Sequence, residues 1–342
     1  MIKIENISDI NIWEFFLDQS IIEPIFFQGW TWGQLERSRG KEVFNIGIYN
    51  ENQLIGVALA VLVKAKRGRF LHIRGGPVIN YNSDIDIKEV YKKLIEFADS
   101  NKCDFLRLSP NIFKKDDQKI KKLMGLGFKY CQMHDVDAEV TWVLDLSQNE
   151  EDILKGMRDS TRYLIKKALK SPDLKIIQTK ELKYLENFWE IYQDTVARQK
   201  WKAYSYDYIK EEFLEYLKND EISLFLAEYK GKFIAASLFI YYKNQVFYHH
   251  SGSLTEFRNI PAMYLLHWES IREAKRRGCT KYNFFGIARD NNPKHPWAGL
   301  SLFKKGFGGK QVEMVHALDY PITKKYWVTY TYEKLEKKLR GY

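Results

Sequence analysis

Three stretches of the sequence combine residue types that could do chemistry, and the first surrounds a lysine. The segment Gly299–Gly309 (GLSLFKKGFGG) places Phe303 and Lys304 before a glycine-rich turn. A lysine flanked by Phe303 and Phe307 is expected to be partly desolvated, and a charge held there can stabilise a developing oxyanion. The alternative is a lysine at a helix end that complements the helix dipole. The local pattern by itself favours this second interpretation.

The second stretch is the pair His249-His250. Imidazoles are common metal ligands, but neighbouring side chains of a strand point to opposite faces. We therefore expect that the two rings do not bind one ion, and a structural or substrate-facing role stays open for one of them. The three cysteines show no CxxC spacing and indicate neither a disulfide framework nor a zinc site.

The third stretch is basic. Arg158, Arg162, Lys166 and Lys170 follow one another at i, i+4 steps on a helix expected to begin near Glu150. A solvated helix face is the ordinary explanation of such a stripe. A surface that contacts nucleic-acid phosphates is the alternative.

Composition limits the class of protein. The chain has 342 residues, of which 45% are hydrophobic and 15% aromatic, so it can fill two domain cores and is neither disordered nor fibrous. Lysine and arginine number 54 against 44 acidic residues, and the net charge of +10 favours an anionic partner. The longest apolar run, Leu54–Val63, is about half a membrane span. The N-terminal segment shows no signal-peptide pattern, so a cytoplasmic protein is expected.

A long-period repeat predicts the elements that position these residues. Ile46–Val63 indicates a strand, turn and strand, and Leu224–Tyr241 repeats this pattern. In both halves another strand, a helix ending in a cysteine, a further strand and a short helix follow. This order resembles the GNAT acyltransferase fold, so we expect an α/β protein of two GNAT-like domains with mixed sheets. The expected domains are 1–147 and 148–323, with a C-terminal helix in 324–342 that completes the first.

Acetyl-CoA-dependent GNAT proteins cradle pyrophosphate with a Gln/Arg-x-x-Gly-x-Gly/Ala loop at a helix N-terminus. The segments at that position here are Arg74–Pro77 (RGGP) and Ser251–Leu254 (SGSL), and neither has this spacing. The sequence therefore gives no support to a CoA site.

Three motifs together are similar to the Fem aminoacyltransferases, the FemABX group of peptidoglycan-bridge enzymes. They are FFQGWTWGQLERSRG near the start, MRDSTRYLIKKA at the opening of the second domain, and GLSLFKKGFGG. The chain resembles most the short FemX type, because it has no long polar helical pair for a coiled-coil arm. The resemblance implies transfer of an amino acid from aminoacyl-tRNA to an amine of a peptidoglycan precursor's stem peptide. It implies no metal or organic cofactor.

The resemblance also assigns residues. The family's Phe-Lys pair falls on Phe303 and Lys304, which makes these the candidate catalytic residues. The family's substrate-channel tyrosine matches Tyr208, and an aromatic position of its Tyr-x-Tyr-x-Gly-Ser motif is His250. The stripe Arg158, Arg162 and Lys166 becomes the candidate tRNA-binding surface.

Several departures concern the acceptor. Glu36 stands where one type has a lysine, and Tyr204 replaces an arginine that contacts the diphosphate. Ser109 replaces a common acid, and Arg37 is a substitute phosphate ligand. These departures favour a lipid-linked precursor over a nucleotide-linked one. We expect a monomer that contacts the inner membrane face peripherally.

Two other functions stay open at this point. One is an acyl-CoA-dependent N-acyltransferase on the same fold. A rise in the melting temperature of the protein on addition of CoA would support it. The other is a non-catalytic tRNA-binding protein, which would bind tRNA without transferring label to an acceptor peptide.

Overall fold

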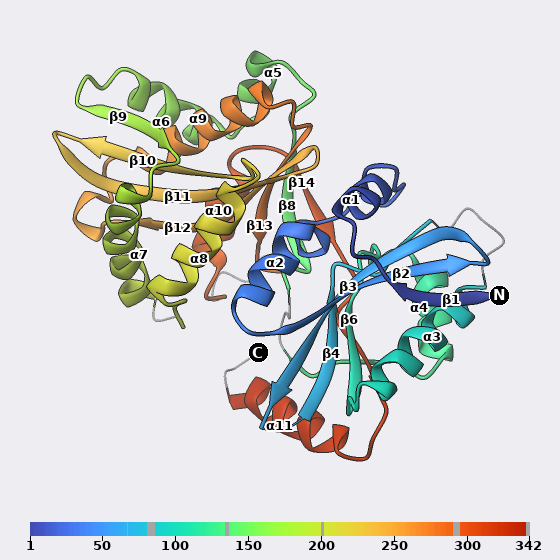
Figure 1. The fold of residues 1–342 in the computed structure, drawn as a ribbon. Helices are drawn as coiled ribbons and strands as arrows, with labels where there is room; N and C mark the ends of the chain where they lie inside the picture. Colours follow the sequence, from blue (N-terminus) through green and yellow to red (C-terminus); the bar gives the residue numbers. More distant parts are fainter. Residues whose placement is uncertain (67, 81–85, 134–136, 200–201, 290–294, 340–342) are drawn as a thin grey trace. The chain divides into compact units, whose positions relative to one another are not determined.

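The computed structural model describes residues 1–66, 68–80, 86–133, 137–199, 202–289 and 295–339. The chain forms two compact units, each with its own sheet (Figure 1). The first combines Met1–Glu139 with Glu313–Tyr342, and the second is Val140–Val312. The expected α/β fold with two mixed sheets is confirmed.

The sheet of the first unit has the strand order β1-β2-β3-β4-β6-β15-β7, with β5 paired to β3. Only the pair β4 and β6 is parallel among the strand pairs described in this unit. The strands are β1 Ile2–Asn6, β2 Glu42–Asn50, β3 Gln53–Ala65, β4 Gly68–Arg74, β5 Val78–Ile79, β6 Phe105–Ser109, β7 Lys129–Tyr130 and β15 Leu318–Pro321. The α-helices are α1 Ile10–Asp18, α2 Trp30–Ser38, α3 Ile87–Ser100, α4 Asp117–Gly125 and α11 Tyr326–Leu339.

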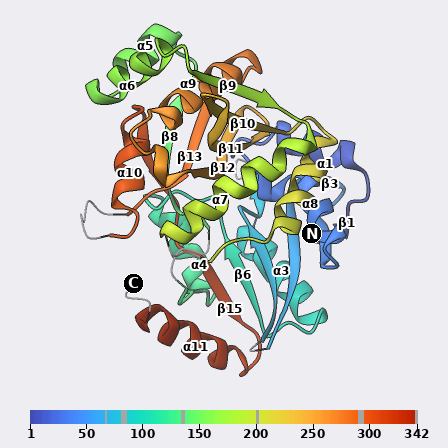
Figure 2. The ribbon, with the colours of Figure 1, turned by 90° about the vertical axis from the view of Figure 1, so that its left-hand side faces the viewer.

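The sheet of the second unit has the order β14-β8-β13-β12-β11-β10-β9, in which β12 and β13 are parallel. Helix α7 packs on β11 and β12 and crosses in front of them in Figure 2. The strands are β8 Val140–Asp145, β9 Leu174–Thr179, β10 Ile222–Tyr229, β11 Lys232–Tyr242, β12 Gln245–Ser253, β13 Lys281–Gly286 and β14 Lys310–Glu313. The α-helices are α5 Glu150–Gly156, α6 Asp159–Leu169, α7 Leu185–Gln199, α8 Tyr206–Leu217, α9 Ala262–Arg276 and α10 Ala298–Lys305.

The predicted hairpins and helices of the repeat occur in both units, as β2–β3 with α3 and as β10–β11 with α9. In the second hairpin Lys230 and Gly231 have φ of 50° and 80°. Two consecutive positive φ values are those of the type I′ turn, whose twist matches that of the flanking strands. In the described part of the chain no helix exceeds 15 residues, the length of α7 and α9.

The boundaries of the two units differ from the expected ones, because β8 and β15 each join the sheet of the unit other than the one expected. Strand β8 was expected to end the first domain, but it pairs with β13 of the second sheet. Strand β15, expected in the second domain, pairs with β6 of the first sheet. Helix α11 follows β15 and packs on β4 of the first unit. The expected segment 324–342 ends with three residues that lie outside the described ones.

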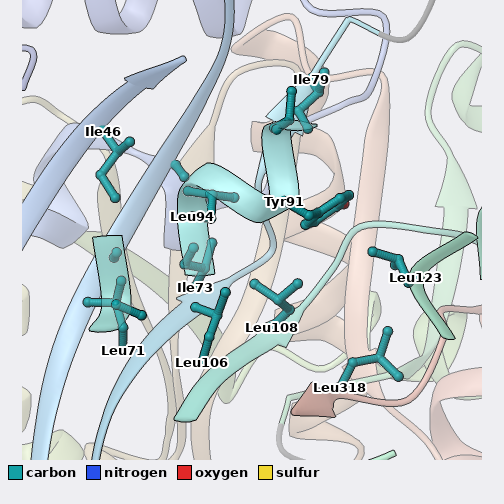
Figure 3. Packing of buried hydrophobic residues seen from close by; sticks show 14 of the residues in the cluster. Ile46, Leu71, Ile73, Ile79, Tyr91, Leu94, Leu106, Leu108, Leu123 and Leu318 are labelled. Atoms are coloured by element: carbon teal, nitrogen blue, oxygen red, sulfur yellow. The ribbon is translucent and has the colours of Figure 1, made fainter. Parts of the chain in front are cut away.

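The core of the first unit lies between its sheet and α3 (Figure 3). Helix α3 begins after Asp86, whose side chain accepts hydrogen bonds from two backbone N–H groups of the first turn. Its buried residues recur at helical spacing and pack on the inward residues of the central strands. Those shown are Tyr91 and Leu94 of α3 with Leu71, Ile73, Leu106 and Leu108 of the sheet.

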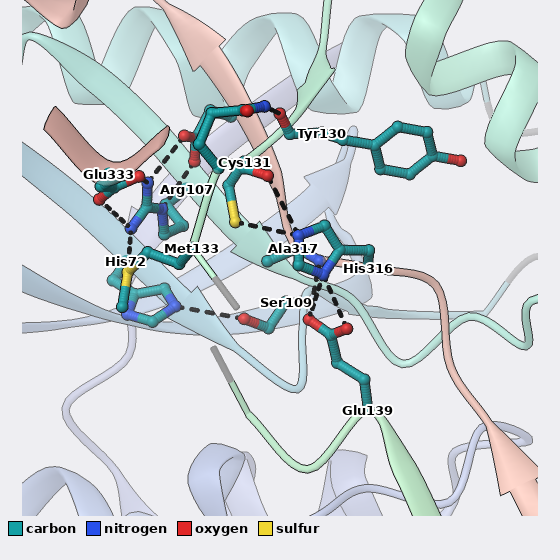
Figure 4. A network of polar contacts seen from close by, with 12 residues as sticks. His72, Arg107, Ser109, Tyr130, Cys131, Met133, Glu139, His316, Ala317 and Glu333 are labelled. Carbon is teal, nitrogen blue, oxygen red and sulfur yellow. Dashed lines mark hydrogen bonds and ion pairs between the residues drawn. The ribbon is translucent and has the colours of Figure 1, made fainter. Parts of the chain in front are cut away.

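Buried polar contacts hold the C-terminal segment to the first unit (Figure 4). The guanidinium of Arg107 on β6 donates to Asp319 of β15 at 2.7 Å and to Glu333 of α11 at 2.9 Å. His316 Nδ1 donates to the carboxylate of Glu139 at 2.7 Å, and its Nε2 lies 3.5 Å from Cys131 Sγ. Strand β15 is therefore held by ionic contacts as well as by its strand pairing.

In the described part of the chain, no helix combines the length and the apolar character needed to cross a membrane.

The His316–Glu139 contact predicts how stability depends on pH. Burial lowers the pKa of His316, but its bonds to Cys131 and Glu139 outweigh this and raise the pKa from 6.5 to about 10. The contact therefore contributes fully below pH 6.5 and is lost as pH rises through about 10. In that window the proton held by His316 contributes a fall in the unfolding free energy of up to about 1.4 kcal/mol per pH unit.

His316→Gln should remove this contribution. Between pH 6 and 10, urea unfolding should therefore show that the unfolding free energy of the variant changes more positively with pH than that of the wild type. Equal slopes in the variant and the wild type would contradict the prediction.

Candidate active site

Lys304 is a buried residue of α10 whose ammonium lies between two strands that have separated. The parallel pairing of β12 and β13 stops after Phe247 and Asn283, although both strands continue. Beyond that point, Lys304 Nζ donates to the carbonyl of Gly286 at 2.7 Å and lies 5.4 Å from the ring centre of Tyr248. The side chain is only 4% exposed. Lys304 thus holds a buried charge and is not an exposed residue at a helix end.

The glycine-rich turn after α10 fixes this helix against its neighbours. Gly308 and Gly309 have φ of 78° and 95°, values that residues other than glycine rarely adopt. A Cβ at Gly309 would lie 2.4 Å from the carbonyl oxygen of Val143 in β8, so the turn must come close to this strand. Arg158 N donates to the carbonyl of Gly306 at 2.9 Å. Two of the motifs, MRDST and KGFGG, therefore contact one another.

Burial changes the acid–base behaviour of Lys304. It lowers the pKa of this ammonium from 10.5 to about 7. Burial and the charge of Lys304 likewise lower the pKa of His267 to about 3. Near neutral pH the lysine is thus present in both its charged and its neutral form, and the neighbouring imidazole is neutral.

Phe303, the other candidate catalytic residue, faces the aromatic core. Its half-buried ring packs at centroid distances of 5.1 Å from Tyr264, 5.3 Å from His267 and 5.2 Å from Phe307. These contacts position α10, and with it Lys304, on the sheet.

Three of the predicted substrate-binding residues lie together in the second unit. Tyr204 stacks on Tyr208 at 4.5 Å, and its ring lies edge-on to His250 at 5.2 Å. Tyr204 is 50% exposed, whereas Tyr208 and His250 are buried. The group is therefore an aromatic surface with one solvent-facing ring.

The expectation that His249 and His250 point apart is wrong. The pairing of β11 with β12 shifts from Phe239 opposite Tyr248 to Leu238 opposite His250, so that His249 is an extra, bulged residue. A bulge places two consecutive residues opposite one and changes the alternation of side chains. Both imidazoles consequently contact the same carboxylate, that of Glu212 on α8.

Sequence reasoning missed Glu212, which is fully buried. His249 Nε2 and His250 Nε2 each lie 2.9 Å from one of its oxygens. The available signal was an acid four residues after Tyr208 and directly before the buried Phe213. That spacing puts Tyr208 and Glu212 on one helix face, toward the core.

The other two predicted substrate-binding residues, Arg37 and Ser109, belong to the first unit. Arg37 donates to Asn45 Oδ1 at 2.5 Å, and burial lowers its pKa. Ser109 Oγ lies 3.3 Å from His72 Nε2 (Figure 4). Glu36, beside Arg37, is 3% exposed and forms ion pairs with Arg39 and Lys41.

The helix expected to begin near Glu150 is two helices, and the basic stripe lies on the second, α6, with Arg158 as its N-cap and Lys170 as its C-cap. Helix α5 ends before Met157, and Arg158 has an extended ψ of 142° at the start of α6. Arg158 donates to the carbonyl of Leu302 at 3.0 Å. Arg162 donates to the carbonyl of Lys155 at 3.1 Å, near the end of α5. Lys166 is exposed on α6.

The fold is that of a duplicated α/β protein with two GNAT-like domains. A family model described as the FemAB family matches residues 15–232 and 218–334. The chain belongs to the FemAB family, and the resemblance to the Fem aminoacyltransferases is confirmed.

Individual relatives agree with this membership. Aminoacyltransferase FemA of Staphylococcus aureus (strain MRSA252) is 24% identical over an alignment of 381 positions, gaps included, that covers 87% of this chain and 90% of that protein. The crystal structure of FemX has a TM-score of 0.85 at 16% identity and covers 95% of this chain and 98% of its own. A tandem GNAT protein from the clavulanic acid biosynthesis pathway has a TM-score of 0.59 at 9% identity, over 94% and 98% of the chains. The structural likenesses show the fold, and the relatives' names support a transferase.

The burial of Lys304 predicts a titration near neutral pH. In protein labelled with ¹³C-lysine, the Cε signal of Lys304 should shift with a midpoint of about pH 7, far below the usual 10.5. Lys304→Met identifies the signal by its loss. The unfolded chain keeps this proton up to the ordinary pKa, so Lys304 contributes a rise in the unfolding free energy between these two values, opposite in sign to the contribution of His316. A Lys304 signal that does not move between pH 6 and 8 would contradict the assignment.

Proposed function

We propose that the protein transfers an amino acid from aminoacyl-tRNA to an amine on the stem peptide of a peptidoglycan precursor. The observation that carries this proposal is the buried ammonium of Lys304 where β12 and β13 have separated. It occupies the lysine position of the family's Phe-Lys motif. The name of the staphylococcal FemA, an aminoacyltransferase, supports the reaction class.

The reaction requires that the two substrates be oriented toward each other and that one developing negative charge be stabilised. The acceptor amine, in its neutral form, attacks the ester carbonyl of the aminoacyl-tRNA, so that a C–N bond forms and the carbonyl oxygen becomes an oxyanion. An ammonium has three N–H donors, and Gly286 accepts one of those of Lys304. Another can donate to the oxyanion in surroundings where a charge acts strongly. The C–O bond to the tRNA ribose then breaks, and the ribose oxygen leaves with a proton from the amine.

The alternative CoA-dependent function finds less support in the backbone. Ser251, Gly252 and Ser253 belong to strand β12 and do not form a loop at a helix N-terminus. A Cβ at Gly252 would lie 2.7 Å from the carbonyl oxygen of Ile191, so helix α7 already fills the space beside this glycine. We expect that CoA does not raise the melting temperature.

Replacing Lys304 should remove most of the transfer activity. Loss of one electrostatic contact to an oxyanion typically costs about a hundred- to a thousand-fold in rate. We expect Lys304→Met to show this loss in turnover with labelled aminoacyl-tRNA and precursor, while circular dichroism stays unchanged. The matched control is Lys305→Met, which removes the same charge from the next residue of α10. Near wild-type turnover of Lys304→Met would refute the assigned role.

We propose that α6 contributes to tRNA binding through the stripe Arg158, Arg162 and Lys166. Arg158 and Arg162 also support α10 and α5, so their replacement would disturb the fold. The sharper test is Lys166→Gln with Lys170→Gln, both exposed. Two lost phosphate contacts should make the slope of log affinity against log salt shallower by about 1.4 to 1.8.

Lys230→Gln with Lys232→Gln, in the β10–β11 hairpin, is a control of equal net charge. If the slope of log affinity against log salt changes equally in both double variants, or in neither, the stripe on α6 is not a tRNA-binding surface.

We further propose that the acceptor is a lipid-linked precursor, reached by transient contact with the membrane face. The positions of two expected phosphate ligands hold Glu36, which is buried in ion pairs, and Tyr204. Each well-placed lysine or arginine contributes about 1 kcal/mol of attraction to an anionic membrane. Transfer should be faster to the lipid-linked than to the nucleotide-linked form of one precursor. The reverse order would favour Arg37 as the phosphate ligand, and Arg37→Gln would then slow transfer to the nucleotide-linked form.

A further inference from the structure

The second unit contains a buried carboxylate, that of Glu212, that meets two imidazoles. Glu212 is fully buried, and its contacts in the described part of the chain are His249, His250 and the hydroxyl of Tyr208. Two imidazoles and one carboxylate thus meet in a buried place, where ionisable groups are normally paired or bind metals.

The three side chains converge as metal ligands do. One nitrogen of each histidine and one oxygen of Glu212 lie within 4.8 Å of one another. The two Nε2 atoms are each 2.9 Å from the carboxylate. The convergence depends on the bulge at His249, because regular alternation along β12 would send one ring to the other face of the sheet.

We propose that Glu212, His249 and His250 bind one divalent first-row transition-metal ion, for which Zn²⁺ is the probe. Two imidazole nitrogens and one carboxylate oxygen form a donor set that Zn²⁺ accepts. The side chain of His249 is 11% exposed, so the site can be reached from solvent. Three protein ligands leave one tetrahedral position for water or another ligand.

The surroundings hold the ligands in place. The ring of His249 packs edge-on against Phe285 at 6.2 Å, and that of His250 packs against Tyr192 at 6.2 Å. Tyr208 Oη donates to Glu212 Oε1 at 3.4 Å, a contact that orients the carboxylate. A bound ion would tie α8 to β12 beside the aromatic surface of Tyr204 and Tyr208.

The test uses the full chain after treatment with a chelator and then dialysis. We expect equilibrium dialysis with Zn²⁺, read by elemental analysis, to give one bound ion per chain. Co²⁺ in the same site should give the visible absorption of a four- or five-coordinate ion. Zn²⁺ should also raise the melting temperature of the chelator-treated protein.

His249→Asn and Glu212→Gln should each weaken Zn²⁺ binding by more than the roughly 10- to 100-fold that follows loss of a hydrogen-bond partner of a metal ligand. His295→Asn, another histidine of the second unit, is the matched control and should keep one equivalent. If Glu212→Gln does not fold, His249→Asn tests the proposal alone. The side chain of His249 is partly exposed to solvent, so its replacement disturbs the core less than that of Glu212. Absence of bound Zn²⁺ in the wild type, or equal binding by His249→Asn, would overturn the proposal. These measurements read binding alone and do not depend on the transfer reaction.

Discussion

The candidate active site depends on keeping an ammonium out of water. Burial lowers the pKa of Lys304 to about 7, and the carbonyl of Gly286 accepts a hydrogen bond from its ammonium. Such a group is costly to the folded state and useful to a reaction that develops negative charge. The ammonium of Lys304 lies where the pairing of β12 with β13 has ended. The aromatic packing of Phe303 and the close approach of the glycine turn to β8 hold α10 against the sheet.

The same strand β12 contacts a second buried ionisable group, the carboxylate of Glu212 on α8. Tyr248 faces Lys304, whereas the bulge at His249 turns both histidines toward Glu212. One extra residue in the strand thus brings two imidazoles to the same buried carboxylate. The stacked rings of Tyr204 and Tyr208 pack beside this cluster, with Tyr204 edge-on to His250.

The sheet of each unit contains a strand that pairs with a partner far away in the sequence. Strand β8 precedes the rest of the second unit and pairs with β13, and β15 returns from its far end to pair with β6. The ion pairs of Arg107 and the contact of His316 with Glu139 hold the returning segment. The first unit therefore needs the C-terminus of the chain to finish its sheet.

The sequence by itself determined the repeated hairpins, the α/β class and the family, because strand alternation, turn residues and the GLSLFKKGFGG motif are local patterns. It also marked Lys304, although the local pattern favoured an exposed helix-end lysine. Only the tertiary structure decided three matters. The ammonium of Lys304 is buried because β13 brings Gly286 to it, and Glu212 meets both histidines because a bulge breaks the period of two. Strand β8 joins the second sheet because strand pairing depends on hydrogen bonds between segments far apart in sequence, which no local pattern records.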